Sequence, residues 1–222
     1  PDRRADRQGA RTQGLPAERV LAEALGTSRT VVKRAYDYLR EREMVNSRGR
    51  AGTVLRPHTR IQPEMGRLKG FTQEMQEVGM VPSTRLVSRQ IVSDRTMASL
   101  FGRPSYASFL HLVRVRLAND KPMTREVAWY DLTLAPHLEN WDGHGSAYDY
   151  IQQDPNLVLD WAQQSVEATM SDPPEMAEFG FFTPQPCLLL KRRTYTTNGA
   201  MAEYAEGVFR GDAYTYSLRL KV

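Results

Sequence analysis

Two arginines, Arg114 and Arg116, lie two positions apart in the stretch 110–117, which reads Leu-His-Leu-Val-Arg-Val-Arg-Leu. In a β-strand, residues two positions apart share one face and lie about 7 Å from each other. Two guanidinium groups directed to the same side suit a carboxylate or a phosphate better than they suit an apolar core. The alternative is a solvated sheet face on which the arginines pair with nearby acids, such as Glu126 on the next strand. The spacing alone favours that alternative.

A second group of candidate residues lies in the segment 15–41. A first short helix is expected to begin near Pro16 and to end at Gly26, and Thr27 or Ser28 can cap a second helix. The apolar residues expected to face the core are Val20, Leu21, Ala24 and Leu25 in the first helix, and Val31, Val32, Ala35, Tyr38 and Leu39 in the second. The residues left to point outward are Ser28, Arg29, Thr30, Lys33 and Arg34. This arrangement is typical of a helix-turn-helix, in which the start of the second helix reaches base edges in the major groove of DNA.

The stretch 44–57 continues this pattern. It reads as a strand, a glycine-containing turn and a second strand, with Arg48 and Arg50 at the tip. Such a hairpin has the shape of a wing, which lays cations along the neighbouring minor groove or the DNA backbone. The alternative is an ordinary helical hairpin followed by a β-hairpin with a basic surface. The ordered set of helix, helix and basic hairpin favours DNA binding over that alternative.

Charge is distributed unevenly along the chain. Residues 1–60 contain 14 Lys and Arg against 7 Asp and Glu, whereas residues 61–222 contain 16 against 19. A basic segment followed by a larger, mildly acidic one suggests a head that binds a polyanion and a body with another role. A basic, solvated tail is the alternative.

Composition argues against several other classes of protein. The single cysteine, Cys187, cannot form an intrachain disulfide, which fits a reducing cytoplasm. No stretch approaches the ~18 consecutive apolar residues of a membrane span. No leader is expected either, and the first 14 residues read as a disordered or trimmed segment. The 4 histidines lack metal-ligand spacing, so neither a metal nor a cofactor is expected.

The larger body reads as a sheet with a few helices. The segment 56–70, with two prolines and two glycines, is expected to be a linker, and a helix is expected at 71–79. Alternating β-branched and aromatic residues predict strands at 84–92, 108–120, 124–132, 187–199 and 201–222. Asn198-Gly199 predicts a hairpin turn, and helices are expected at 147–154 and 160–170. An antiparallel sheet with a few helices is an α+β domain.

The first part of the chain resembles the winged helix-turn-helix of the GntR family of bacterial transcription regulators. The resemblance lies in the segments LPAERVLAEALGTSRTVVKRAYDYLRE and RGRAGTVL. It implies DNA contacts at Arg19, Ser28, Arg29 and Thr30, and phosphate contacts at Lys33 or Arg34. It also implies a wing that contains Arg48, Gly49, Arg50 and Gly52. Ala17 stands where the family usually has Ser, and Glu43 stands where a Gly normally ends the recognition helix.

The remainder resembles the effector-binding UTRA domain of the HutC subfamily, in the segments RLKGFTQEMQEVGMVPSTRLVS, LVRVRLANDKPMTREVAWYDL, GSAYDYI and AEYAEGVFRGDAYTYSL. The resemblance implies a chorismate-lyase-like fold, with a mostly antiparallel sheet, flanking helices and a small-molecule pocket in each subunit. The implied effector-binding residues are Arg114, Arg116, Glu126, Ser146, Glu203 and Phe209. Phe209 is often Tyr in sugar-phosphate-responsive members, so one hydroxyl is missing here. Arg210 and Asp212 match an Arg-Gly-Asp motif whose expected role is in turn and sheet structure.

These observations predict an α+β protein with a winged helix-turn-helix at 1–55, a linker at 56–70 and a UTRA-like effector-binding domain at 71–222. The predicted protein is a cytoplasmic homodimer, a transcription repressor rather than an enzyme. Its affinity for double-stranded operator DNA is expected to depend on a small effector, either a sugar phosphate, a sugar acid or another small anion. Two alternatives stay open. One is a lyase-like enzyme in which the arginines hold a carboxylate and Glu126 or Glu203 is the acid or base. The other is a small-molecule sensor that does not bind DNA.

Overall fold

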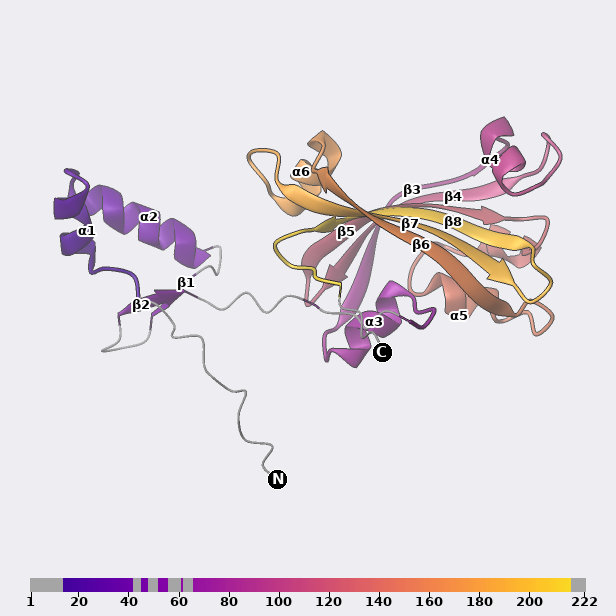
Figure 1. The fold of residues 1–222 in the computed structure, drawn as a ribbon, viewed down its shortest axis with the longest axis horizontal. Helices are drawn as coiled ribbons and strands as arrows, with labels where there is room; N and C mark the ends of the chain where they lie inside the picture. The colour runs from indigo at the N-terminus through magenta and orange to yellow at the C-terminus, as the bar shows by residue number, and fades with distance from the viewer. Residues whose placement is uncertain (1–13, 42–44, 48–51, 56–60, 62–65, 217–222) are drawn as a thin grey trace, which may run out of the picture. The chain divides into compact units, whose positions relative to one another are not determined.

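The computed structural model describes residues 14–41, 45–47, 52–55, 61 and 66–216. Internal contacts divide the chain into two compact units, Pro1–Thr59 and Arg60–Val222 (Figure 1). Each unit is therefore described by itself. No helix in the described parts of the chain is long and apolar enough to cross a membrane.

The first unit contains the two helices and the hairpin that the sequence predicts. Helix α1 spans Glu18–Ala24 and helix α2 spans Arg29–Glu41, and Gly26 between them has a positive φ of 60°. Strands β1 (Val45–Ser47) and β2 (Thr53–Leu55) pair in antiparallel fashion. The small core consists of Ala22, Val32 and Tyr36, with Leu15 and Leu21 packed against it.

The buried faces of α1 and α2 differ from the predicted stripes. The exposed members of those stripes are Val20, Ala24, Leu25, Val31, Ala35 and Tyr38. Val32 is buried as predicted, and Ala22 on α1 and Tyr36 on α2 are buried although the predicted stripes do not include them. Tyr36 is fixed inward because its hydroxyl donates a hydrogen bond to the Pro16 carbonyl at 2.7 Å. Helix α1 begins at Glu18, after Ala17 as the N-cap residue, which agrees with the predicted start near Pro16.

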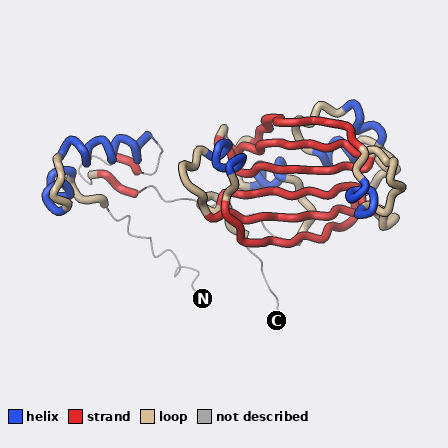
Figure 2. Tube along the Cα trace, turned by 90° about the horizontal axis from the view of Figure 1, so that it is seen from above, coloured by secondary structure: helices blue, strands red, loops and turns tan. Residues whose placement is uncertain are grey.

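The second unit is built on one antiparallel sheet of six strands in the order β3-β4-β5-β8-β7-β6 (Figure 2). The strands are β3 (Pro82–Val92), β4 (Phe109–Ala118), β5 (Lys121–Asp131), β6 (Leu159–Met170), β7 (Pro186–Thr196) and β8 (Met201–Arg210). The helices are α3 (Phe71–Glu77), α4 (Arg95–Leu100), α5 (Ala147–Ile151) and α6 (Pro173–Phe179), with a 3-10 turn at Pro136–Asn140. Helices α3 and α5 lie against one face of the sheet, and α4 and α6 lie toward opposite ends of the other face (Figure 1). The predicted α+β class is confirmed.

Tight turns set the register of the central hairpins. Gly199, with φ 75°, follows Asn198 in the turn between β7 and β8, as the sequence predicts. Asn119 and Asp120 have positive φ values of 48° and 61° in the turn between β4 and β5. The register between β4 and β5 pairs Arg114 with Glu126, and the register between β5 and β8 pairs Tyr130 with Glu203. Directly paired residues point to the same face of the sheet, so the side chains of each pair are neighbours.

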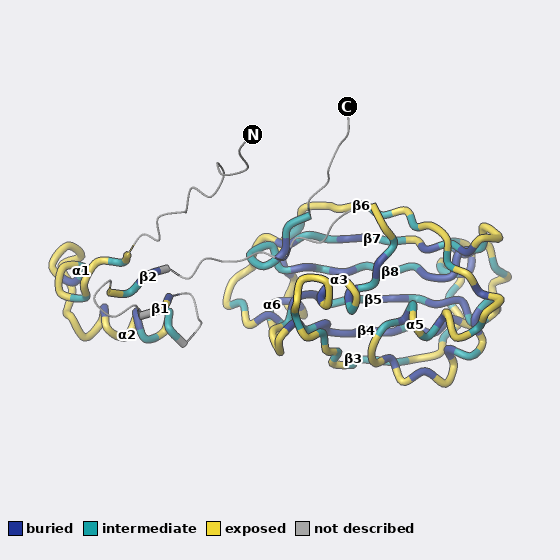
Figure 3. The backbone as a smooth tube through the Cα atoms, turned by 90° about the horizontal axis from the view of Figure 1, so that it is seen from below, coloured by how far each residue is buried: buried dark blue, intermediate teal, exposed yellow. Residues whose placement is uncertain are grey.

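Apolar side chains fill the space between the helices and the sheet in separate clusters. One lies around Trp141, Ile151 and Leu112, another around Phe71, Met75 and Tyr214, and a third around Phe101, Phe109 and Met201. The central strands are largely buried, whereas the edge strand β6 is mostly exposed or half-buried (Figure 3).

The helix predicted at 160–170 is wrong, because this segment is the edge strand β6. Its Ala, Gln and Glu residues favour a helix in isolation, but pairing along β7 overrides that preference. Trp161 stacks on Tyr195 of β7 with ring centroids 4.1 Å apart, and Glu167 accepts a hydrogen bond from Lys191 of β7 at 3.1 Å. Helices α4 and α6 are further elements that the sequence pattern does not predict.

Candidate functional site: a basic helix face and a buried polar cavity

The outward face of α2 carries the residues predicted to contact DNA. Ser28 precedes the helix, and its Oγ accepts a hydrogen bond from the Val31 N–H at 3.3 Å, so Ser28 caps α2. Ser28, Arg29, Thr30, Lys33 and Arg34 are all exposed. The structure therefore places a row of hydroxyl and cationic side chains along the first turns of α2.

Two of the predicted DNA contacts are already paired with acids. Arg29 Nε lies 3.4 Å from Glu18 Oε2, and Arg19 Nη1 lies 2.8 Å from Glu23 Oε1. Both arginine side chains are more than 70% exposed, so the pairs are solvated and weak. Either guanidinium can exchange its carboxylate for a phosphate or a base at little cost.

Thr53 of β2 joins the hairpin to α2 and to the segment before α1. The Leu15 N–H donates to the Thr53 carbonyl at 2.7 Å, and Arg40 of α2 donates to Thr53 Oγ1 at 3.5 Å. Gly52 is exposed with φ 74°, next to the predicted tip. The predicted wing residues Arg48, Gly49 and Arg50 lie outside the described residues.

In the second unit, a cavity of about 60 Å³ lies between α3, α5 and the sheet. One water needs roughly 10–15 Å³ on this measure, so the cavity admits a small ligand. All six residues predicted to bind an effector line it, although they come from distant parts of the sequence: Arg114, Arg116, Glu126, Ser146, Glu203 and Phe209. The cavity also includes residues that the sequence analysis did not single out: Thr72, Glu74, Tyr148, Gln164, Arg192 and Tyr216.

Arg114 is a buried guanidinium whose donors are occupied. Nε donates to Glu126 Oε1 at 2.9 Å, and Nη2 also contacts this oxygen. Nη1 donates to the Gly143 carbonyl at 3.2 Å, and the guanidinium carbon lies 5.1 Å from the centre of the Trp141 ring. Burial opposes the charged form, but the Glu126 carboxylate outweighs it and raises the pKa of Arg114. Burial likewise opposes the Glu126 carboxylate, and Arg114 nevertheless lowers its pKa, so both groups are ionised as a pair.

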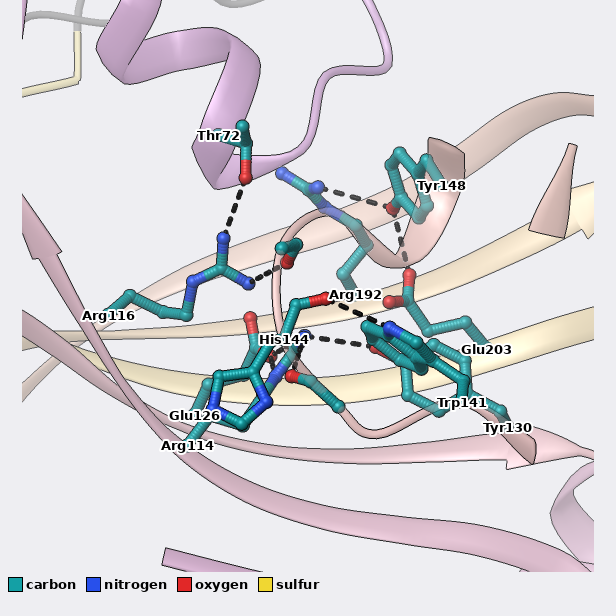
Figure 4. A network of polar contacts seen from close by, with 12 residues as sticks. Thr72, Arg114, Arg116, Glu126, Tyr130, Trp141, His144, Tyr148, Arg192 and Glu203 are labelled. Carbon is teal, nitrogen blue, oxygen red and sulfur yellow. Dashed lines mark hydrogen bonds and ion pairs between the residues drawn. The ribbon is translucent and has the colours of Figure 1, made fainter. Parts of the chain in front are cut away.

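Arg116, two residues further along, is buried without an acid partner. Nη1 donates to the Gly145 carbonyl at 3.1 Å and Nη2 donates to Thr72 Oγ1 at 2.8 Å (Figure 4). Its Nε has no hydrogen-bond partner, and among the described residues no carboxylate lies within ion-pair distance of it. Burial, together with the neighbouring Arg114 charge, lowers the pKa of Arg116 to about 10. Arg116 is therefore still cationic at neutral pH. Glu126 attracts its charge, but the ion pair of Glu126 is with Arg114 and not with Arg116.

The opposite side of the cavity holds a second polar network, shown in Figure 4. Arg192 of β7 donates to the Lys69 carbonyl at 2.8 Å and to the Tyr148 hydroxyl at 3.3 Å. The Tyr148 hydroxyl and Thr194 Oγ1 each donate to Glu203 Oε2, at 2.8 and 2.7 Å. Since both bonds end on the same oxygen, the other oxygen of Glu203 is an acceptor for a hydroxyl or amino group.

The sequence signal for this second network is weak. Arg192 lies within Leu-Leu-Leu-Lys-Arg-Arg, where apolar and polar residues do not alternate, so period two does not show which arginine faces inward. Tyr148 follows Ser146, whose Oγ caps α5 by accepting the Asp149 N–H at 3.2 Å. The helix predicted at 147–154 is confirmed as α5, and Ser146 is its N-cap residue. Among the described residues, no group of His, Cys, Asp and Glu side chains could hold a metal ion.

A helix-turn-helix with a basic outer face, joined in one chain to a sheet domain with a cavity lined by buried charged residues, defines the class of one-component regulators that sense a small molecule. The chain matches the family described as "Bacterial regulatory proteins, gntR family" over residues 10–55 and the UTRA domain over residues 77–215. It therefore belongs to the GntR family of regulators, in the HutC-like group that carries a UTRA domain.

Relatives of this chain include named repressors. It is 34% identical over 204 residues to the HTH-type transcriptional repressor NagR of Bacillus subtilis (strain 168), covering 91% of this chain and 83% of that protein. It is 25% identical to the mannosyl-D-glycerate transport/metabolism system repressor MngR of Escherichia coli (strain K12), covering 92% and 85%. The crystal structure of PhnF from Mycobacterium smegmatis superposes with a TM-score of 0.68 at 26% identity, covering 96% of this chain and 95% of that one. The family and these relatives are transcriptional regulators and not enzymes, which overturns the lyase alternative.

Proposed function

We propose that this protein is a DNA-binding repressor whose affinity for its operator falls when a small anion occupies the cavity of the second unit. The proposal rests above all on Arg116, a buried cation in a cavity that supplies it with neutral acceptors only. A buried charge without a counterion is costly, and an anionic ligand removes that cost.

The remaining cavity residues divide into two groups in this proposal. Ser146 and Glu203 contact the polar groups of the effector, and Phe209 forms an apolar wall. Arg114 and Glu126, which neutralise each other, shape the floor of the site and orient its neighbours. The effector is therefore an anion with at least one hydroxyl or amino group, a description that fits a sugar phosphate or a sugar acid.

The first unit supplies the DNA-binding half of the proposal. In this proposal the exposed residues Arg29 and Thr30 contact base edges, and Lys33 and Arg34 contact phosphates. Arg19 and the Gly52 end of the hairpin contact the DNA backbone. Two copies of the chain, as a homodimer, read the two halves of a two-fold operator. Effector binding favours a dimer in which the two heads no longer match these half-sites.

The test begins with a thermal-shift screen of the wild-type chain against sugar phosphates, sugar acids, amino-acid derivatives and small carboxylates. A ligand that binds the folded state raises the melting temperature. We expect Arg116→Gln to remove this rise, while Arg193→Gln keeps it, because Arg193 is exposed on the opposite face of the sheet. Loss in both variants, or in neither, contradicts the assignment of Arg116.

The wild-type protein is first used to select an operator duplex from genomic fragments. The ligands that raised the melting temperature are then added to the complex of the protein with this labelled duplex. Affinity of the wild type should fall with added salt and with added effector. The Arg116→Gln variant should keep its DNA affinity and lose the response to effector. Ligand binding without any salt-dependent DNA affinity would instead support the sensor that does not bind DNA.

A further inference from the structure

Ile61 lies where the chain enters the second unit, and it pairs with the segment that follows β8. It is the second residue of that unit, and it is only 3% exposed. Its N–H donates to the Ala213 carbonyl at 2.8 Å, and its carbonyl accepts a hydrogen bond from the Thr215 N–H at 2.9 Å. Together these two hydrogen bonds form a parallel β-bridge between Ile61 and Tyr214. We name these contacts the Ile61 clamp.

The residues that form the clamp follow directly from the Arg-Gly-Asp turn at the end of β8. Arg210 donates two hydrogen bonds to the Asp212 carboxylate, at 3.0 and 2.8 Å. The Gly211 N–H donates to the Pro186 carbonyl at 3.2 Å, and a Cβ at Gly211 would lie 2.5 Å from that oxygen. Only glycine fits this close approach, so the turn fixes the direction in which the chain leaves the sheet. The expected structural role of the motif agrees with this geometry.

The clamp is joined to the wall of the cavity through a buried hydrogen bond. The Tyr214 hydroxyl donates to Glu74 Oε2 at 2.9 Å, with Tyr214 1% and Glu74 9% exposed. Glu74 belongs to α3 and lines the cavity. Tyr214 therefore contacts Ile61 through its backbone neighbours and contacts the cavity wall through its side chain.

The position of α3 depends in turn on the two cavity arginines. Arg116 donates to Thr72 on the first turn of α3, and Arg192 donates to the Lys69 carbonyl just before it, both at 2.8 Å. These are the donors that an anion in the cavity competes for. When they turn to a ligand, α3 loses bonds at its N-terminal end while Glu74 remains tied to Tyr214.

From these contacts we propose that Glu74 and Tyr214 are positioning residues that couple occupancy of the cavity to the hold on Ile61. An anion on Arg116 releases Thr72, α3 shifts with Glu74, and the Ile61 clamp weakens. The coupling rests on the proposed function, because it needs the anion site at Arg116. In this proposal, ligand binding in the cavity acts first on Ile61, where the chain enters the second unit from the DNA-binding unit.

Hydrogen exchange at single amides of the full chain tests the clamp without any ligand. Tyr214→Phe keeps the ring in its apolar cluster and removes only the hydroxyl. We expect exchange at Ile61 and Thr215 to become about fivefold faster, the effect of losing one net hydrogen bond. Tyr204→Phe is the matched control, because it removes a hydroxyl bonded to Glu206 on the other face of the sheet. Equal exchange at Ile61 in wild type and Tyr214→Phe overturns the inference.

Two variants of Glu74 separate positioning from general destabilisation. Glu74→Gln keeps an acceptor for the Tyr214 hydroxyl and should preserve slow exchange at Ile61. Glu74→Ala removes the acceptor and should match Tyr214→Phe. If Glu74→Gln accelerates exchange as much as Glu74→Ala does, the hydrogen bond is not what holds the clamp.

Inorganic phosphate is the probe for coupling to the cavity. Phosphate should raise the melting temperature of the wild type but not of Arg116→Gln, and should speed exchange at Ile61 in the wild type but not further in Tyr214→Phe. A higher melting temperature with unchanged exchange at Ile61 overturns the coupling and leaves the anion site standing. If phosphate does not raise the melting temperature, the proposed anion site fails, and the ligand-free comparison alone decides whether the clamp exists.

Discussion

Arg114 and Arg116 share a strand face and are equally buried, but their surroundings differ in charge. Arg114 is neutralised by Glu126, while Arg116 donates hydrogen bonds to a carbonyl and a hydroxyl and lies over the Phe71 ring. Spacing places both arginines on one face without distinguishing them, because the difference depends on the strand register that puts Glu126 opposite Arg114. The alternative of acid pairing therefore describes Arg114, and the proposed anion site rests on Arg116.

The Arg114–Glu126 pair gives a prediction about stability. Glu126→Gln leaves a fully buried guanidinium without its counterion, and removing one partner of a buried pair costs about 3 kcal/mol or more. We expect about 3 kcal/mol, because the Glu126 side chain retains 19% exposure. Equilibrium unfolding in urea measures the loss.

The control for this prediction is Glu167→Gln, which breaks an ion pair with Lys191 on the edge of the sheet. That pair is solvated, so its loss should be below about 1 kcal/mol. A double variant with Arg114→Met and Glu126→Leu should recover much of the stability, since an apolar pair of similar volume needs no counterion. Equal losses for Glu126→Gln and Glu167→Gln would show that the buried pair contributes no more to the free energy of unfolding than the solvated pair does.

Helix α4 is an element that hydrophobic periodicity does not reveal. It has only six residues, Arg95–Leu100, and begins after Asp94, whose carboxylate accepts the Met97 N–H at 2.8 Å. We expect Asp94→Ala to reduce the free energy of unfolding by about 1 kcal/mol, while Asp94→Asn, also a good N-cap residue, loses little. Urea unfolding of the three chains decides this. If Asn is as destabilising as Ala, the carboxylate charge matters and the cap does not.

The strands of the sheet are predictable from the sequence to different degrees. Strands β4 and β5 contain β-branched and aromatic residues and are joined by the Asn119-Asp120 turn, so their positions follow from local chemistry. The edge strand β6 gives the opposite result, since its residues are good helix formers and its strand conformation comes from pairing with β7. The six predicted cavity residues converge because they lie on or next to well-predicted strands or at a clear helix start. Arg192 and Glu74 were missed, because only the packing of α3 on the sheet directs them to the cavity.

For the whole molecule, the uneven charge separates two tasks along one chain. The basic residues concentrate in residues 1–60, whereas residues 61–222 carry a slight acidic excess. The basic segment attracts DNA, and the acidic excess of the remainder discourages that part from binding the polyanion non-specifically. A ligand in the second unit can then regulate DNA binding only through the dimer arrangement or through the connection between the units.

The proposed dimer makes the spacing of operator half-sites a measurable quantity. Heads held by a two-fold dimer match half-sites about 10 base pairs apart or a multiple of that distance. Inserting five base pairs rotates one half-site to the far side of the duplex, and we expect affinity to fall at least tenfold, to the level of a single half-site. Inserting ten base pairs restores the facing direction, and should recover more affinity than the five-pair insertion does. Fluorescence anisotropy with the three duplexes measures this, and equal affinity for all three would contradict a dimer that positions the heads.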